Sequence, residues 1–231
     1  MRSKPTLTMT RILILLILPL LLIPFMVDGQ SSDAKLWAGV SIEQKLSKQL
    51  AYSIEIEQRL YNNFSSFDRT FFQPSLSYKL NKHWSLGINY RIWNRQTIEQ
   101  EYFLHHRATL GIDYGNKIHG FKWKIYSKIQ YGLPDVREFD FYVTKKLVNR
   151  NSAKISYKIF GSRYTPFMKY ELFTLLDRLQ AMNYQWRILG GTNFYINEFT
   201  DLRLFYLYEH EYNVLNRTDS YIWGISLRYS L

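Results

Sequence analysis

The chain has 231 residues, no cysteine, a formal net charge of +11 and an aromatic content of 17%. Without a thiol there is no disulfide scaffold, no cysteine-ligated zinc and no thiolate nucleophile. The length allows one domain of moderate size, or two small ones. Because the basic residues are spread along the chain instead of clustering in one segment, we expect no nucleic-acid partner.

The N-terminal segment has the three parts of an export signal. The basic residues Arg2, Lys4 and Arg11 are followed by an apolar run over 12–25, and Val27 and Gly29 place small residues at the minus-three and minus-one positions of a cleavage site. A membrane anchor is the alternative, but the run is short for a helix that needs about twenty residues. We therefore expect cleavage near Gly29.

This interpretation divides the chain into a signal peptide over 1–29 and a single domain over 30–231. The signal removes three basic residues and Asp28, which leaves 27 basic and 18 acidic residues and a net charge of +9 on the mature domain. The excess of basic residues therefore belongs to the folded part of the protein.

Strict alternation of apolar and polar residues is the main signal beyond residue 30. In segment 219–231 the apolar residues are Tyr221, Trp223, Ile225, Leu227, Tyr229 and Leu231, while Ser220, Gly224, Ser226, Arg228 and Ser230 lie between them. This period of two is typical of β-strands with two different faces. The same pattern predicts strands over 50–60, 83–93, 102–114 and 121–131, and looser alternation predicts strands over 35–46, 70–80, 153–160, 164–173, 184–195 and 201–212. Segment 138–147 also alternates and is the twelfth predicted strand.

Twelve segments predict an all-β, antiparallel, up-and-down barrel of about 12 strands, with 10 as the fallback if 35–46 lies outside the wall. Bacterial single-chain barrels usually have an even number of strands, which places both ends of the wall on the same side of the membrane. Short connections are expected at Ser47-Lys48, Asn81-Lys82 and Asn197-Glu198, where turn-forming residues separate the strands.

Two features favour a transmembrane barrel over a soluble sheet. Aromatic residues end many apolar faces, as an aromatic girdle at the membrane surfaces requires. The predicted girdle residues are Trp84, Tyr90, Tyr102, Tyr114, Trp123, Tyr184, Trp186, Tyr221, Trp223 and Tyr229. The opposite faces carry charges in mid-strand, which a polar lumen tolerates. A soluble exported β-protein with one solvated face stays open as an alternative, since such sheets also alternate.

Several short motifs occur in an order that resembles a known family. They are Trp37 to Val40, the Glu-x-Glu-x-Arg pattern over 55–59, Pro74 to Tyr78, His106-Arg107, Pro166-Phe167 with Glu171 to Phe173, and the aromatic last strand. Together they resemble the domain of unknown function 2490 family of exported proteins from Gram-negative bacteria. The resemblance covers 35–231 and implies an outer-membrane barrel, but it implies no activity.

The lumenal faces predict two groups of charged residues. A polar network is expected from Glu55, Glu57, Arg59, Arg91, His105, Arg107, Glu171, Arg187, Arg203, Glu209 and Arg228, because charges of both signs inside a barrel must pair. A basic sector is expected from Lys122, Lys124, Lys128, Lys154 and Lys158. Such a sector favours anionic solutes or lipopolysaccharide phosphates unless neighbouring acids compensate it.

No catalytic motif, metal site or cofactor site is evident. His105 and His106 are adjacent, so on a strand their side chains point to opposite faces. The alternative function is a lipid-modifying enzyme at the membrane rim with His105 as its base, but no Gly-x-Ser-x-Gly motif is present. We therefore expect a non-enzymatic protein with no catalytic residues, no metal and no cofactor.

Taken together, the sequence predicts a structural, binding or narrow-channel protein of the bacterial outer membrane. Its expected partners are the lipid bilayer, lipopolysaccharide and, during insertion, the barrel-assembly machinery. The last residue is Leu231 instead of the aromatic residue typical of such barrels, although Tyr229 lies two residues earlier.

Overall fold

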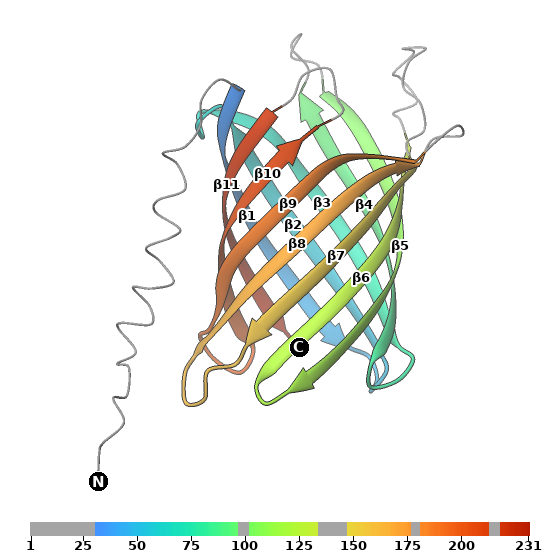
Figure 1. Cartoon of the computed structure of the whole chain (residues 1–231), viewed down its shortest axis with the longest axis vertical. Coiled ribbons are helices and arrows are strands. Elements are labelled where there is room, and N and C mark those ends of the chain that lie inside the picture. The colour runs from blue at the N-terminus through green and yellow to red at the C-terminus, as the bar shows by residue number, and fades with distance from the viewer. Residues whose placement is uncertain (1–30, 97–101, 134–146, 177–180, 213–217) are drawn as a thin grey trace.

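Eleven β-strands form a closed barrel in the computed structural model of the chain, which describes residues 31–96, 102–133, 147–176, 181–212 and 218–231 (Figure 1). The strands are β1 (Ser31–Lys45), β2 (Leu50–Tyr61), β3 (Ser66–Lys79), β4 (Trp84–Gln96), β5 (Tyr102–Ile118), β6 (Phe121–Leu133), β7 (Leu147–Tyr157), β8 (Tyr164–Leu176), β9 (Ala181–Tyr195), β10 (Thr200–Glu211) and β11 (Thr218–Ser230). Consecutive strands pair antiparallel around the wall. The predicted all-β barrel is confirmed. No helix in the described residues is long and apolar enough to cross a membrane.

The strand number differs from the predicted twelve and from the fallback of ten. Strand β6 pairs directly with β7, so the wall closes with eleven strands among the described residues. The strand predicted over 138–147 falls outside the described residues except for Leu147, which begins β7. In a meander with an odd number of strands the first and last run in the same direction, and β1 accordingly pairs parallel with β11.

This parallel closure places the two ends of the wall on opposite rims of the barrel. Ser31 lies opposite Thr218 at one rim, and Glu43 lies opposite Ser230 at the other. Figure 1 shows β11 ending at the rim where the ribbon connections are short. The expectation that both ends lie on the same side is therefore wrong for this wall, because it assumed an even number of strands.

Side chains at the predicted turns stabilise the short connections. Ser47, Asn81 and Asn197 each accept hydrogen bonds from the backbone N–H groups two and three residues further along, at 2.8–3.1 Å. These local bonds satisfy backbone donors that the strand ladder leaves open. Strands β5 and β6 are joined more tightly, by His119 and Gly120 with φ angles of 46° and 87°. That left-handed pair is typical of a two-residue hairpin turn.

The outer face of the barrel is apolar and exposed. Val40, Ile88, Leu110, Ile125 and Met168, from five different strands, expose between 52% and 59% of their surface. A band of this kind around the whole wall far exceeds the apolar patches of soluble proteins. Ile88, Leu110 and Ile125 are among the residues that alternation along the sequence assigned to the apolar face.

Aromatic residues form two groups on this outer face. Near the short-turn rim, the ring of Tyr114 lies 4.8 Å from that of Trp84 and 5.4 Å from that of Trp123. Towards the other rim an arc of rings crosses β8 to β11, from Tyr170 through Trp186 and Tyr208 to Tyr221. On β9, Trp186 belongs to this arc, and Phe194, eight residues further along, lies near the short-turn rim beside Tyr164. For a strand tilted by about 40°, this separation corresponds to about 20 Å along the barrel axis.

Other predicted girdle residues have varied positions. Trp84, Tyr90, Trp223 and Tyr229 are exposed on the outer face, while the side chain of Tyr102 lies outside the described part of the structure. Tyr184 differs from the prediction because a bulge between Phe173 and Thr174 shifts the register of β8 and β9. Its ring lies 6.2 Å from that of Phe173, on the lumenal side of the wall.

Candidate functional site in the barrel lumen

One side of the lumen is lined by apolar side chains. Trp37, Leu207 and Ile222 are buried together, with Leu189 and Phe205 packed against them. These residues come from β1, β9, β10 and β11, which are neighbours in the closed wall. Large side chains that project inward from this side fill space that would be open in a wide porin.

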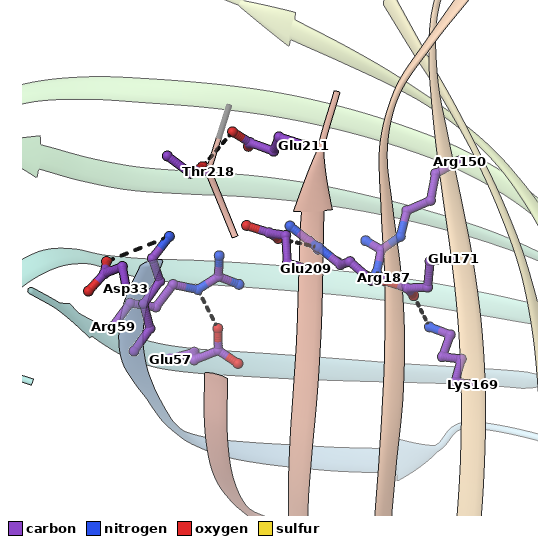
Figure 2. A network of polar contacts seen from close by, with 11 residues as sticks. Asp33, Glu57, Arg59, Arg150, Lys169, Glu171, Arg187, Glu209, Glu211 and Thr218 are labelled. Atoms are coloured by element: carbon purple, nitrogen blue, oxygen red, sulfur yellow. Dashed lines mark hydrogen bonds and ion pairs between the residues drawn. The ribbon is translucent and has the colours of Figure 1, made fainter. Parts of the chain in front are cut away.

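Two groups of ion pairs lie in the lumen, one on β2 and the other across β7 to β10 (Figure 2). Arg59 donates to Glu57 at 2.7 Å, and Arg187 donates to Glu209 at 2.5 Å. Glu171 accepts two hydrogen bonds from Arg150 at 2.6 and 2.7 Å, pairs with Lys169 and lies 3.9 Å from Arg187. All of these residues belong to lumenal faces of their strands.

Trp37 connects the two halves of this network. The guanidinium carbon of Arg59 lies 3.6 Å from the centre of the Trp37 ring, and that of Arg187 lies 5.6 Å from it. Because β2 and β9 are separated by β1, β11 and β10 in the wall, the contact spans the interior of the barrel. Arginine and tryptophan side chains therefore occupy part of the lumen at this level.

Glu171 is the most enclosed charge in the network, with 2% of its side chain exposed. Removing one partner of a buried ion pair typically costs about 3–5 kcal/mol, since the remaining charges lose their compensation. Three cations face this carboxylate, so it stabilises charges from β7, β8 and β9 at once. The network thereby holds these strands together through the lumen as well as through the wall.

Arg91 and Arg107 lie directly opposite each other on β4 and β5. Arg91 stacks on Phe71 at 3.6 Å and donates through Nε to Gln73 at 2.7 Å. Neither arginine forms an ion pair with any residue that the structure describes. Like charges at opposite positions of a sheet repel each other, so this pair forms a basic region in which neither arginine has an ion pair within the described residues.

A second basic region lies on the lumenal face of β6, β7 and β8. Lys124 is opposite Lys154, and Lys154 is opposite Lys169, so three lysines form a row across the wall. Lys124 pairs with Asp113 at 2.8 Å and Lys169 pairs with Glu171. Lys154 lies 4.4 Å from the ring centre of Phe167, and within the described residues it has no acidic partner.

The other charged residues predicted to face the lumen lie at several separate places in the barrel. Glu55 accepts a hydrogen bond from Gln73 at 3.2 Å, and Arg203 donates to Asn193 at 3.0 Å. Arg228 lies 3.8 Å from Asp201 and 4.0 Å from Glu43. In the predicted basic sector, Lys128 lies 5.6 Å from the ring of Tyr126. Lys122 is exposed near the rim, and Lys158 follows the end of β7 and points into solvent.

The histidine of the alternative enzyme hypothesis lies on the lumenal side. His105 stacks on Trp93, with ring centres 5.2 Å apart, and His106 on the other face is 3.0 Å from the hydroxyl of Tyr90. His105 is near the start of β5, at the rim opposite the short turns. In the described residues no three side chains of metal-binding type converge on a common point.

Some residues of the lumen were not identified from the sequence. Phe71, Gln73 and Lys169 have the same parity as predicted lumenal neighbours, so alternation could have found them. Trp37 lies in the more weakly patterned first strand, and its contact with Arg187 depends on the curvature of the closed wall. No local sequence signal carries that information.

An apolar exposed outside, aromatic groups near both rims and a charged interior define a β-barrel of the outer-membrane type. The chain belongs to the family described as "Protein of unknown function (DUF2490)", whose sequence profile matches residues 34–219. This confirms the resemblance seen in the sequence motifs. No curated relative matches the chain by sequence.

Similar solved structures share the barrel at low sequence identity. A structure titled "NanC porin structure in rhombohedral crystal form" has a TM-score of 0.50 and 10% identity, over 76% of this chain and 86% of that one. A bacterial polysaccharide outer membrane secretin has a TM-score of 0.49 and 9% identity, over 75% and 72%. The β-domain of the Bordetella autotransporter BrkA has a TM-score of 0.43 and 7% identity, over 76% and 81%.

Proposed function

We propose that the protein is a non-enzymatic barrel of the bacterial outer membrane whose obstructed lumen binds small anions and conducts them weakly. The observation that carries the proposal is the surplus of basic side chains on the lumenal faces of β4 to β8. There, Arg91, Arg107, Lys128 and Lys154 form no ion pair with any residue that the structure describes. A basic, narrow interior attracts anions and disfavours cations.

The outer face supports the membrane location. Exposed Ile, Leu and Val side chains around the wall would contact water in a soluble protein, at a cost of about 25 cal/mol per Å² of apolar surface. In a bilayer the same side chains meet lipid tails, and the aromatic groups lie near the two interfaces. The lipid bilayer is therefore the partner for which this surface is suited.

The orientation follows from the connections. Outer-membrane barrels place short turns in the periplasm and longer loops outside the cell. By this rule the rim with Ser47, Asn81 and Asn197 faces the periplasm, together with Leu231. The opposite rim would meet lipopolysaccharide, and the aromatic last strand ending in Leu231 would be offered to the barrel-assembly machinery.

The lumenal contacts favour weak conduction over a wide channel. Trp37 and the arginines stacked on it occupy the interior at one level, and Phe205, Leu207 and Ile222 fill the apolar side. Ions must pass along the basic side, where lysine and arginine side chains line β4 to β8. This arrangement favours a small conductance that depends on the charge of the ion.

Recordings in planar bilayers test the channel part of the proposal. With purified protein between unequal KCl solutions, we expect small conductance steps and a reversal potential that indicates chloride preference. Replacing Lys154 by Gln should reduce this preference, whereas replacing Lys158, which points into solvent, should not. Silent bilayers over a range of salt concentrations, or a preference for potassium, would contradict the proposal.

Lipid analysis tests the absence of enzymatic activity. Mass spectra of lipid A and phospholipids from cells with and without the protein should be the same. A species that has lost an acyl chain only when the protein is present would favour the rim enzyme. That change should then disappear on replacing His105 by Ala.

A further inference from the structure

The charges of the lumenal arginines are unequally compensated. Five arginines lie on the lumenal faces of β2, β4, β5, β7 and β9: Arg59, Arg91, Arg107, Arg150 and Arg187. Arg59 pairs with Glu57, Arg150 with Glu171 and Arg187 with Glu209. Of these five, Arg91 and Arg107 form no ion pair in the described part of the chain, and they are neighbours; Arg203 on β10, farther along the wall, forms none either. Two positive charges are therefore concentrated at one place.

Hydrogen-bond donors at the same place are also without partners. The buried Nε of Arg107 and the buried hydroxyl of Thr109 have no hydrogen-bond partner within the described residues. Both side chains lie on the lumenal face of β5, two residues apart, and Thr109 is 5% exposed. Buried polar groups without a partner are rare in folded proteins, because each costs about 1–3 kcal/mol. The buried side-chain oxygens of Asn149, Thr165 and Ser220 also lack a partner in the described residues; Arg107 and Thr109 differ from them in sharing the strand face that carries the arginine pair.

The neighbouring side chains hold the two guanidinium groups in place. Arg91 is fixed by Phe71 beneath its plane and by Gln73, which accepts its Nε–H. Gln73 is itself held by Glu55. Arg107 lies 5.7 Å from the ring of Trp93, which stacks on His105. Apart from the Nε–H of Arg91, no N–H group of the two arginine side chains is hydrogen-bonded to a residue that the structure describes.

From these observations we infer that Arg91, Arg107 and Thr109 form a lumenal binding site for the phosphate group of a small water-soluble solute. A phosphate monoester carries close to two negative charges at pH 7 and three acceptor oxygens. Two guanidinium groups match that charge and can each offer a planar pair of N–H donors, with the Thr109 hydroxyl as a further donor. A carboxylate would neutralise one arginine and leave the other uncompensated.

This inference rests on the proposed anion-binding lumen and names its ligand. The two can fail separately, because conduction is measured in bilayers and phosphate binding is measured on protein in detergent. A barrel that conducts chloride without binding phosphate would retain the proposed function and lose the site. A barrel that binds phosphate and is silent in bilayers would retain the site and lose the channel.

Thermal unfolding of the refolded full-length protein in detergent provides the test, with inorganic phosphate as the probe. Phosphate should raise the unfolding temperature with a saturable concentration dependence, as expected for a ligand that binds only the folded state. Acetate at the same ionic strength should have a smaller effect, and chloride none. Equal shifts with all three anions would overturn the site.

Substitutions of single arginines show which residues bind the phosphate. R91Q and R107Q should each weaken phosphate binding about tenfold or more, because each removes a charged hydrogen-bonding group. R203Q is the matched control, since it removes a lumenal arginine elsewhere in the barrel, and it should change binding by less than about twofold. Unchanged binding in R107Q, or an equal loss in R203Q, would overturn the assignment.

A third variant keeps the test informative if the Gln variants fold poorly. R107E places a carboxylate opposite Arg91, so the unfolding temperature in phosphate-free buffer should rise while the phosphate response disappears. A retained phosphate response in R107E would overturn the site. A soluble ester such as glycerol phosphate should reproduce the effect of inorganic phosphate. Protection by lipopolysaccharide alone would instead place the site on the outer face, against the inference.

Discussion

The ring of Phe205 on β10 lies over Gly224, its direct neighbour on β11, and occupies the space that any side chain at position 224 would need. A glycine weakens a strand on its own, but here it provides the close approach for a large lumenal ring. The centre of the Phe205 ring lies 6.5 Å from the centre of the Trp37 ring, so the two rings pack together inside the lumen. The absence of a side chain at Gly224 on β11 therefore allows Phe205 on β10 to pack against Trp37 on β1.

Replacing Gly224 by Ala should therefore destabilise the barrel. The added methyl group overlaps the Phe205 ring, and forcing an extra group into a packed interior costs about 1–3 kcal/mol. The free energy of unfolding can be measured by urea titration of the protein in detergent. Gly190→Ala is the matched control, since no atom lies close to that position, and it should be neutral within about 0.5 kcal/mol.

The same replacement in a Phe205→Ala background should show coupling. Without the ring, the methyl group at position 224 loses its three nearest neighbours, which are all atoms of Phe205, so its own penalty should fall. An unchanged penalty in that background would mean that the ring is not the cause.

Replacing Glu171 by Gln should destabilise the protein more strongly. The substitution preserves shape but leaves Arg150, Lys169 and Arg187 without their common carboxylate, at a cost of about 3–5 kcal/mol. Glu43→Gln removes an exposed carboxylate 4.0 Å from Arg228 and should cost no more than about 1 kcal/mol. The measurement is again the free energy of unfolding, and equal effects of the two substitutions would argue against a buried network.

Single-cysteine labelling should show which rim faces outward. The chain contains no native cysteine, so each introduced thiol is unique. Ser65→Cys lies between β2 and β3, and Lys48→Cys lies in the turn between β1 and β2 at the other rim. With a membrane-impermeant maleimide on intact cells, position 65 should react and position 48 should react only after lysis. The reverse pattern would invert the proposed orientation.

Replacing Trp37 by Ala should increase conductance. The ring is the platform on which Arg59 and Arg187 stack across the lumen, so its removal widens the interior. The loss of such a large buried side chain should also cost about 3–5 kcal/mol of stability. Trp223→Ala is the control, because Trp223 is 44% exposed on the outer face. Only molecules with the heat-modifiable gel mobility of folded barrels are compared, and equal conductance in the two variants would contradict the obstruction by Trp37.

The sequence alone determined which side chains share a strand face, except at the bulge that turned Tyr184 to the lumenal side. Alternation is a local property of an extended chain, so Glu55, Glu57 and Arg59 share one face of β2 wherever that strand lies in the wall. Turn-forming residues are equally local, and Ser47, Asn81 and Asn197 lie in the predicted connections. The excess of aromatic residues and the dispersed positive charge likewise follow from composition and period.

Tertiary structure decided how these faces meet. The number of strands depends on how many segments the closed wall includes, and eleven strands place the two ends of the wall on opposite rims. Contacts across the lumen, such as Trp37 with Arg187, depend on the curvature of the whole barrel. Which arginine receives a carboxylate is set by register between strands, and register left Arg91 opposite Arg107. Alternation predicted a charged lumen, but only pairing across the wall determined where its charge is uncompensated.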